Sequence, residues 1–131
     1  MIEPGTQATV TYTVDASDLA SAIGVSPADV FPAVLATARM VALMEIAAAR
    51  LMQPMLQAGQ VSVGVSLEVQ HSAPTPLGAR VDVTATYDGP EGKLHRFSIA
   101  ASDPGGPIGS ASHVRAIVDG ARIVARADQR R

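Results

Sequence analysis

The feature that most constrains the fold is a long apolar segment near the middle of the chain. From Val34 to about Met55 the sequence is rich in alanine, leucine and methionine and contains no glycine. A helix that is apolar on almost every side is buried in a protein interior. The segment therefore predicts a long central helix that ends near Pro54 or Gly59. Its few polar residues are Thr37, Arg39, Glu45, Arg50 and Gln53.

Segments in which apolar and polar residues alternate flank this helix and predict β-strands. One precedes the helix, and short clusters of proline, glycine and aspartate separate the four that follow it, which is typical of tight turns. This order predicts an α+β fold in which a five-stranded antiparallel sheet wraps around the central helix, and we expect a single domain over residues 1–131. The five segments are Ala8–Val14, Val61–Ala73, Ala79–Tyr87, Lys93–Ser102 and Ile108–Val118.

Two further segments carry local signals. Ser26, Pro27 and Asp29 have the pattern of a helix start, so we expect a short helix or turn there, interrupted or restarted at Pro32. The arginines of the C-terminal tail could steer an anionic ligand, but we expect a frayed, solvated end. These are Arg122, Arg126, Arg130 and Arg131.

Composition excludes several classes of function. The net charge is -2 and the basic residues outside the tail are scattered, which argues against nucleic-acid binding. The chain has no cysteine, so disulfides, thiolate nucleophiles and cysteine-based zinc sites are excluded. No segment has the pattern of a signal peptide or of a membrane-spanning helix, and we expect a cytoplasmic protein without membrane contact.

Two polar residues do not fit their apolar surroundings. The alternation of Val61–Ala73 directs His71 inward, near the end of the predicted strand. An inward histidine is more often a hydrogen-bonded core residue than a catalytic one. Glu45 stands in the middle of the predicted helix among apolar residues, where a carboxylate needs partners. It could pair with Arg39 or Arg50, but neither stands at the favourable spacing of four residues, so we favour a functional role.

Thr37 is of interest because of its distance from Glu45. The two residues are eight positions apart, so on one unbroken helix their backbones are about 12 Å apart along the axis. They cannot touch directly. Either Thr37 lies at or before a distorted helix start, or the site combines residues from two subunits.

The remaining histidines give weaker signals. His95 stands beside basic residues near a turn, and we interpret it as solvated surface. His113 and Arg115 share one face of a strand, where the arginine could bind a carbonyl or phosphate or equally pair with an acidic residue. The three histidines have no short ligand spacing, so we expect no metal.

The sequence resembles the fluoroacetyl-CoA thioesterases and their relatives in the hot-dog superfamily. The resemblance extends from Phe31 to Val118, through FPAVLATARMVALMEIAAARLM, VGVSLEVQHSAPTP and GSASHVRAIV. It implies that Thr37, Glu45 and His71 form the catalytic threonine, glutamate and histidine set of that family. It also implies a hot-dog fold, an acyl-CoA substrate and no separate cofactor.

The same resemblance implies roles for residues that bind substrate. Gly64 corresponds to a glycine that lines the acyl pocket, Arg115 to an arginine of the site, and Phe31 to an aromatic residue linked to gating and fluoroacyl selectivity. The chain departs from the fluoroacetyl-specific pattern at Ala28, where a second aromatic is expected, and at the pair Ala38–Arg39. The resemblance further implies a homodimer, or a higher oligomer, in which two sheets join and coenzyme A enters along the interface.

The predicted activity is hydrolysis of a small acyl-CoA. His71 would serve as general acid or base, while Glu45 would orient water or His71, or attack directly, and Thr37 would bond to the carboxylate or attack as an alkoxide. The alternatives are a non-catalytic hot-dog protein that binds acyl-CoA or another small ligand, and a dimeric structural protein. A hydratase of the same fold is disfavoured, because the chain has no asparagine and no aspartate just before His71.

Overall fold

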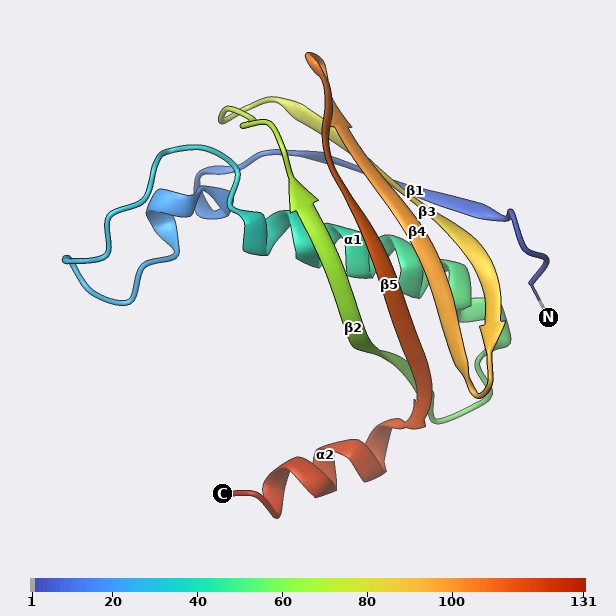
Figure 1. Ribbon diagram of the computed structural model, residues 1–131. Coiled ribbons are helices and arrows are strands. Elements are labelled where there is room, and N and C mark those ends of the chain that lie inside the picture. The colour runs from blue at the N-terminus through green and yellow to red at the C-terminus, as the bar shows by residue number, and fades with distance from the viewer. Residues whose placement is uncertain (1) are drawn as a thin grey trace.

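The computed structural model describes residues 2–131 and confirms the predicted α+β architecture. Five strands form one antiparallel sheet in the order β1-β3-β4-β5-β2, and the sheet curves around the long helix α1 (Figure 1). The elements are β1 (Gln7–Thr13), the 3-10 turns η1 (Ala16–Asp18) and η2 (Ala20–Ala22), α1 (Thr37–Met52), η3 (Gln53–Met55), β2 (Gln60–His71), β3 (Arg80–Glu91), β4 (Leu94–Asp103), β5 (Gly106–Asp119) and α2 (Gly120–Asp128).

Helix α1 fills the hollow of the sheet. Its buried residues recur at the three- and four-residue spacing of one helix face. They are Met40, Leu43, Met44, Ala47, Ala48, Leu51 and Met52. The helix begins at Thr37 and not at the predicted Val34, because Ala36 has extended backbone angles and Leu35 bridges to Leu19. The predicted end is confirmed, since the α-helix passes into the 3-10 turn that contains Pro54.

The sheet presents alternate residues of its central strands to this helix. Val81, Val83, Ala85 and Tyr87 of β3 are buried, and β4 contributes residues of the same alternation. His95 corrects a prediction, because it is not solvated surface. Its Nδ1 lies 2.8 Å from the Tyr87 hydroxyl and burial lowers its pKa. The Tyr87 side chain is buried, so its hydroxyl needs a polar partner, and the partly buried His95 supplies it.

Strand β2 departs from the single alternation that its sequence suggests. The register with β5 shifts between Gly64 and Ser66, where a bulge places an extra residue in β2. Beyond the bulge His71 faces α1 as predicted, but before it the faces are exchanged. Val61 and Val65 are therefore exposed, at 40% and 53%, although the periodicity predicts them to be inward. Ser62 and Gly64 face the helix side in their place.

The segment around Ser26 and the C-terminal tail differ in part from their predicted structures. Ser26 and Pro27 form a turn and no helix, with the Asp29 carboxylate accepting hydrogen bonds from the backbone of Val25 and Ser26. The arginines of the tail are exposed as expected, but Gly120–Asp128 is helical and not frayed, and Asp119 caps its start by accepting from the Arg122 amide. Within residues 2–131 no helix has both the length and the hydropathy needed to cross a lipid bilayer.

Candidate active site

Thr37 and His71 meet where the start of α1 approaches the end of β2. The Thr37 Oγ1 atom lies 2.7 Å from His71 Nδ1, which is hydrogen-bond distance. His71 Nε2 is buried and has no hydrogen-bond partner within residues 2–131. A hydroxyl paired with an imidazole is the arrangement that activates a nucleophile or a water molecule. The two predicted catalytic residues are therefore in direct contact.

These side chains line an open pocket of about 400 Å³. Phe31 borders the same pocket from the connection between η2 and α1, and its side chain is half exposed. Ala28 lies on the same connection and is exposed, and among the described residues that line the pocket Phe31 is the only one of phenylalanine, tyrosine or tryptophan. The remaining lining is largely apolar and comes from Ala20, Pro32, Val34, Leu35, Ser72, Ala73 and Pro74. A small apolar group would fit against the Thr37–His71 pair.

Glu45 has a different partner, the arginine of β5. Arg115 Nη1 lies 3.5 Å from Glu45 Oε1, and the Arg115 side chain is only 7% exposed. Its other nitrogens donate to Ser62, with Nε 3.1 Å from Oγ and Nη2 2.9 Å from the carbonyl oxygen. Burial lowers the pKa of Arg115, and the charge of Glu45 acts in the opposite direction. Within residues 2–131 neither Arg39 nor Arg50 pairs with Glu45.

Gly64 lies directly beneath the Glu45 carboxylate. A Cβ atom at this position would collide with Glu45 Oε1 and would lie 3.3 Å from His113 Cε1. The β2 bulge creates this approach, because it turns Gly64 toward the helix. Among the residues predicted to bind substrate, Gly64 and Arg115 thus lie at the Glu45 carboxylate, whereas Phe31 lies at the Thr37–His71 pair.

The two groups of polar residues are separate within one chain. Thr37 and Glu45 belong to one regular helix, so about 12 Å of axial rise lies between their backbones. The distorted helix start considered from the sequence is excluded, because helical geometry begins at Thr37 itself. Within one chain Glu45 therefore does not contact the Thr37–His71 pair directly.

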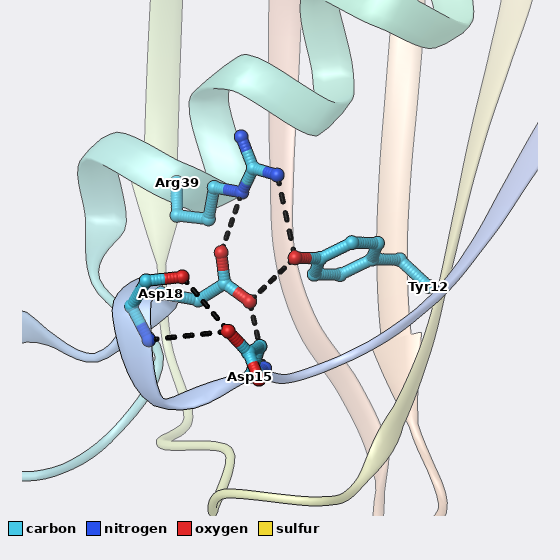
Figure 2. A network of polar contacts seen from close by, with 5 residues as sticks. Tyr12, Asp15, Asp18 and Arg39 are labelled. Atoms are coloured by element: carbon cyan, nitrogen blue, oxygen red, sulfur yellow. Dashed lines mark hydrogen bonds and ion pairs between the residues drawn. The ribbon is translucent and has the colours of Figure 1, made fainter.

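A network not predicted from the sequence fixes the start of α1 (Figure 2). Asp18 is buried and lies 2.8 Å from Arg39 Nε, while the Tyr12 hydroxyl and the Asp15 amide both donate to its other oxygen at 2.7 Å. The Asp18 carbonyl also accepts from the Ala36 amide. Since Ala36 precedes Thr37, the network positions the residue that contacts His71. Tyr12, Asp15 and Asp18 are close together in sequence, whereas Arg39 belongs to the distant helix α1, so no local pattern indicates the contact between Asp18 and Arg39.

Within the described part of the chain no cluster of three or more histidine, aspartate or glutamate side chains could hold a metal ion.

The chain is similar to known proteins of one family. Residues 14–121 match the family described as fluoroacetyl-CoA-specific thioesterase. The chain is 43% identical over 88 residues to the fluoroacetyl-CoA thioesterase of Streptantibioticus cattleyicolor, in a match that covers 67% of this chain and 63% of that protein. The matched region thus spans less than two thirds of that relative's length.

Solved structures are similar over the whole chain. The fluoroacetyl-CoA thioesterase FlK superposes with a TM-score of 0.94 at 34% identity, covering 100% of this chain and 98% of that chain. A variant of FlK has been solved in complex with acetyl-CoA. A hot-dog-like protein from Thermanaerovibrio acidaminovorans superposes with a TM-score of 0.81 at 31% identity, covering 97% and 91% of the two chains. The predicted family resemblance and hot-dog fold are confirmed.

Proposed function

Because the chain belongs to the fluoroacetyl-CoA-specific thioesterase family, we propose that it is an acyl-CoA thioesterase acting on a small acyl group. The observation that carries the proposal is the 2.7 Å contact between Thr37 Oγ1 and His71 Nδ1 at the wall of an apolar pocket. The acetyl-CoA bound by a FlK variant favours a short acyl group, which the pocket of about 400 Å³ can hold. The exposed Ala28 argues against strict selection of a fluoroacyl group.

The proposed chemistry starts at the Thr37–His71 pair. His71 accepts the hydroxyl proton of Thr37 as the oxygen adds to the thioester carbonyl carbon, and the resulting imidazolium donates that proton to the departing sulfur of coenzyme A. Water then attacks the threonine ester with His71 again as the base, and the imidazolium returns this proton to the Thr37 oxygen as the carboxylic acid departs. A glutamate carboxylate beside the ester would orient this water. No cofactor takes part in these steps.

We propose that a second copy of the chain brings this glutamate to the site. Strand β2 lies at the edge of the sheet, with Val61 and Val65 exposed on one of its faces. An exposed apolar edge strand favours pairing with another strand. Antiparallel pairing of two β2 strands would bring the Glu45–Arg115 group of one copy toward the Thr37–His71 pair of the other, giving two sites in a homodimer. The cytoplasmic location and the possibility of a higher oligomer remain predictions.

The first experiment measures hydrolysis of a panel from acetyl-CoA to hexanoyl-CoA, with fluoroacetyl-CoA included, by following the free thiol. Wild-type protein should release coenzyme A from the short members, and Thr37→Ala should lower turnover by about a hundredfold or more. Binding of the panel without any turnover would replace this proposal with the alternative, a non-catalytic protein that binds acyl-CoA. Absence of both would leave only a structural role.

A mixing experiment tests whether the site is shared. Thr37→Ala and Glu45→Gln should each be inactive alone, but dissociation and reassembly of an equal mixture should restore about a quarter of wild-type activity. Half of the random dimers are then mixed, and each mixed dimer has one complete site of two. Reassembly of either variant with itself is the control. Dimers that form without any recovery would contradict a site built from two chains.

A further inference from the structure

His113 of β5 is a buried histidine that takes part in none of the proposed chemical steps. Its side chain is 1% exposed, and both ring nitrogens have protein partners. Nδ1 lies 2.8 Å from the Ser66 carbonyl oxygen, and Nε2 lies 3.2 Å from Arg115 Nη1. The ring thus lies between the β2 bulge and the arginine that contacts Glu45.

These two partners select one protonation state. An arginine nitrogen can only donate, so His113 Nε2 must accept, and a carbonyl oxygen can only accept, so His113 Nδ1 must carry the proton. The ring is therefore neutral with its hydrogen on Nδ1. An imidazolium would direct an N–H group at the guanidinium and lose this contact.

The charged groups around the ring agree with the neutral form. Arg115 faces it from β5 and Glu45 from α1, while Phe97 of β4 packs against it with ring centroids 6.2 Å apart. Burial is the largest influence and lowers the pKa of His113; Arg115 acts in the same direction, and the Ser66 carbonyl and Glu45 oppose them. The histidine therefore remains uncharged at neutral pH.

We propose that His113 is a positioning residue, which as the neutral Nδ1–H tautomer holds Arg115 against Glu45 and ties both to the β2 bulge. The guanidinium is held on three sides: by His113 at 3.2 Å, by Glu45 at 3.5 Å and by Ser62 at 2.9 and 3.1 Å. Ser62 and Ser66 stand on either side of the bulge, so the contacts to Arg115 and His113 also fix its shape. The consequence for turnover rests on the proposed thioesterase function.

Two substitutions separate the two contacts of the ring. In His113→Gln the amide oxygen reaches the position of Nε2 and can accept from Arg115, whereas the contact with Ser66 is lost. In His113→Asn the amide nitrogen occupies the position of Nδ1 and can donate to Ser66, whereas Arg115 loses its acceptor. We expect kcat to fall by about tenfold or more in His113→Asn and by less than about threefold in His113→Gln, with KM little changed in both.

The effect should pass through Arg115. In an Arg115→Ala background, His113→Asn should lower kcat no further, because the group that it positions is absent. A merely structural role predicts similar losses in both His113 variants, in proportion to their thermal stability, and an additive loss in the Arg115→Ala background. Either of these results would overturn the proposal.

Nitrogen-15 NMR of the wild-type protein tests the geometry without any substrate. The His113 ring should show protonated Nδ1 and unprotonated Nε2 at pH 7, and the Arg115 Nη signals should be separate in the wild type and in His113→Gln but averaged in His113→Asn. An Nε2–H tautomer or an imidazolium at pH 7 would refute the inference. If the wild type hydrolyses no thioester, the proposed function fails, while these spectra still decide the role of His113.

Discussion

Replacement of Gly64 by alanine tests the contact on which the Glu45 group depends. The new Cβ atom would collide with Glu45 Oε1, and His113 would have to move by a few tenths of an ångström to relieve its own 3.3 Å contact. The Glu45 side chain is 44% exposed and can rotate into solvent, but it then leaves Arg115. We therefore expect Gly64→Ala to separate the carboxylate from the guanidinium.

The size of the effect follows from the burial of Arg115. Its side chain is 7% exposed, so loss of its carboxylate partner costs about 1 to 2 kcal/mol after allowance for the solvent around Glu45. Removing a glycine from the unfolded chain offsets about 0.4 to 1 kcal/mol of this. The net loss of unfolding free energy is about 1 kcal/mol, and thioester turnover should fall by about tenfold or more.

Urea unfolding and coenzyme A release measure the two effects, and a second background isolates the cause. In Glu45→Ala the colliding oxygen is absent, so Gly64→Ala should be neutral there or stabilise the fold by up to about 1 kcal/mol. Gly120→Ala is the matched control, because its Cβ would meet nothing closer than the Gly59 carbonyl at 3.4 Å. An equal loss of stability from Gly64→Ala in both backgrounds would show that the collision with Glu45 is not the reason.

Three further predictions concern other parts of the structure. Thr37→Ser should retain turnover within about tenfold, because it keeps the hydroxyl that contacts the histidine. Thr37→Val should lose about a hundredfold or more in turnover at similar thermal stability. Steady-state kinetics measures both variants, and full turnover in Thr37→Val would remove the proposed nucleophile. Burial lowers the folded-state pKa of His113, so the unfolded chain binds more protons just below pH 6.5. The contribution of His113 to the free energy of unfolding is complete above about pH 6.5 and is lost as pH falls toward the folded-state pKa. Denaturant titrations from pH 7.5 to about 5 should therefore show wild type losing up to about 1.4 kcal/mol of unfolding free energy per pH unit relative to His113→Gln. Parallel curves for the two proteins would contradict this. Asp18→Asn should lower the free energy of unfolding in urea by about 2 kcal/mol, because it leaves the buried network of Figure 2 incomplete. Asp82→Asn at an exposed pair is the control and should change stability by less than about 1 kcal/mol. Equal losses in the two variants would refute the distinction.

The order of elements could be predicted from the sequence because burial imposes a period on each of them. The apolar segment around Leu43 can hydrogen-bond its backbone groups and bury its side chains only as a helix. The alternating segments can do so only as strands of a sheet. The strand boundaries, including that of β2 at His71, fall within a few residues of the prediction. The helix α2 was missed because none of its residues is buried, and their pattern resembles that of a solvated tail.

The site was predicted less completely. Glu45 and His71 could be recognised because each is a polar residue at an apolar position, and the family resemblance added Thr37. The sequence offered Arg39 or Arg50 as the partner of Glu45 and not Arg115, because the pairing with Arg115 depends on how a strand passes beneath the helix. His95 was assigned wrongly, since the tyrosine whose hydroxyl it contacts lies on the neighbouring strand.

The sequence by itself determined the order of helix and strands along the chain and singled out Glu45 and His71 as polar residues at apolar positions, because periodicity and composition are local properties. Only the tertiary structure decided which of those side chains meet. The β2 bulge is the clearest case: one extra residue at Val65 turns Ser62 and Gly64 toward Arg115 and Glu45, although the alternation of the segment continues unbroken through it. A shift of register reverses every side chain before it, and the pairing of β2 with β5 sets that shift.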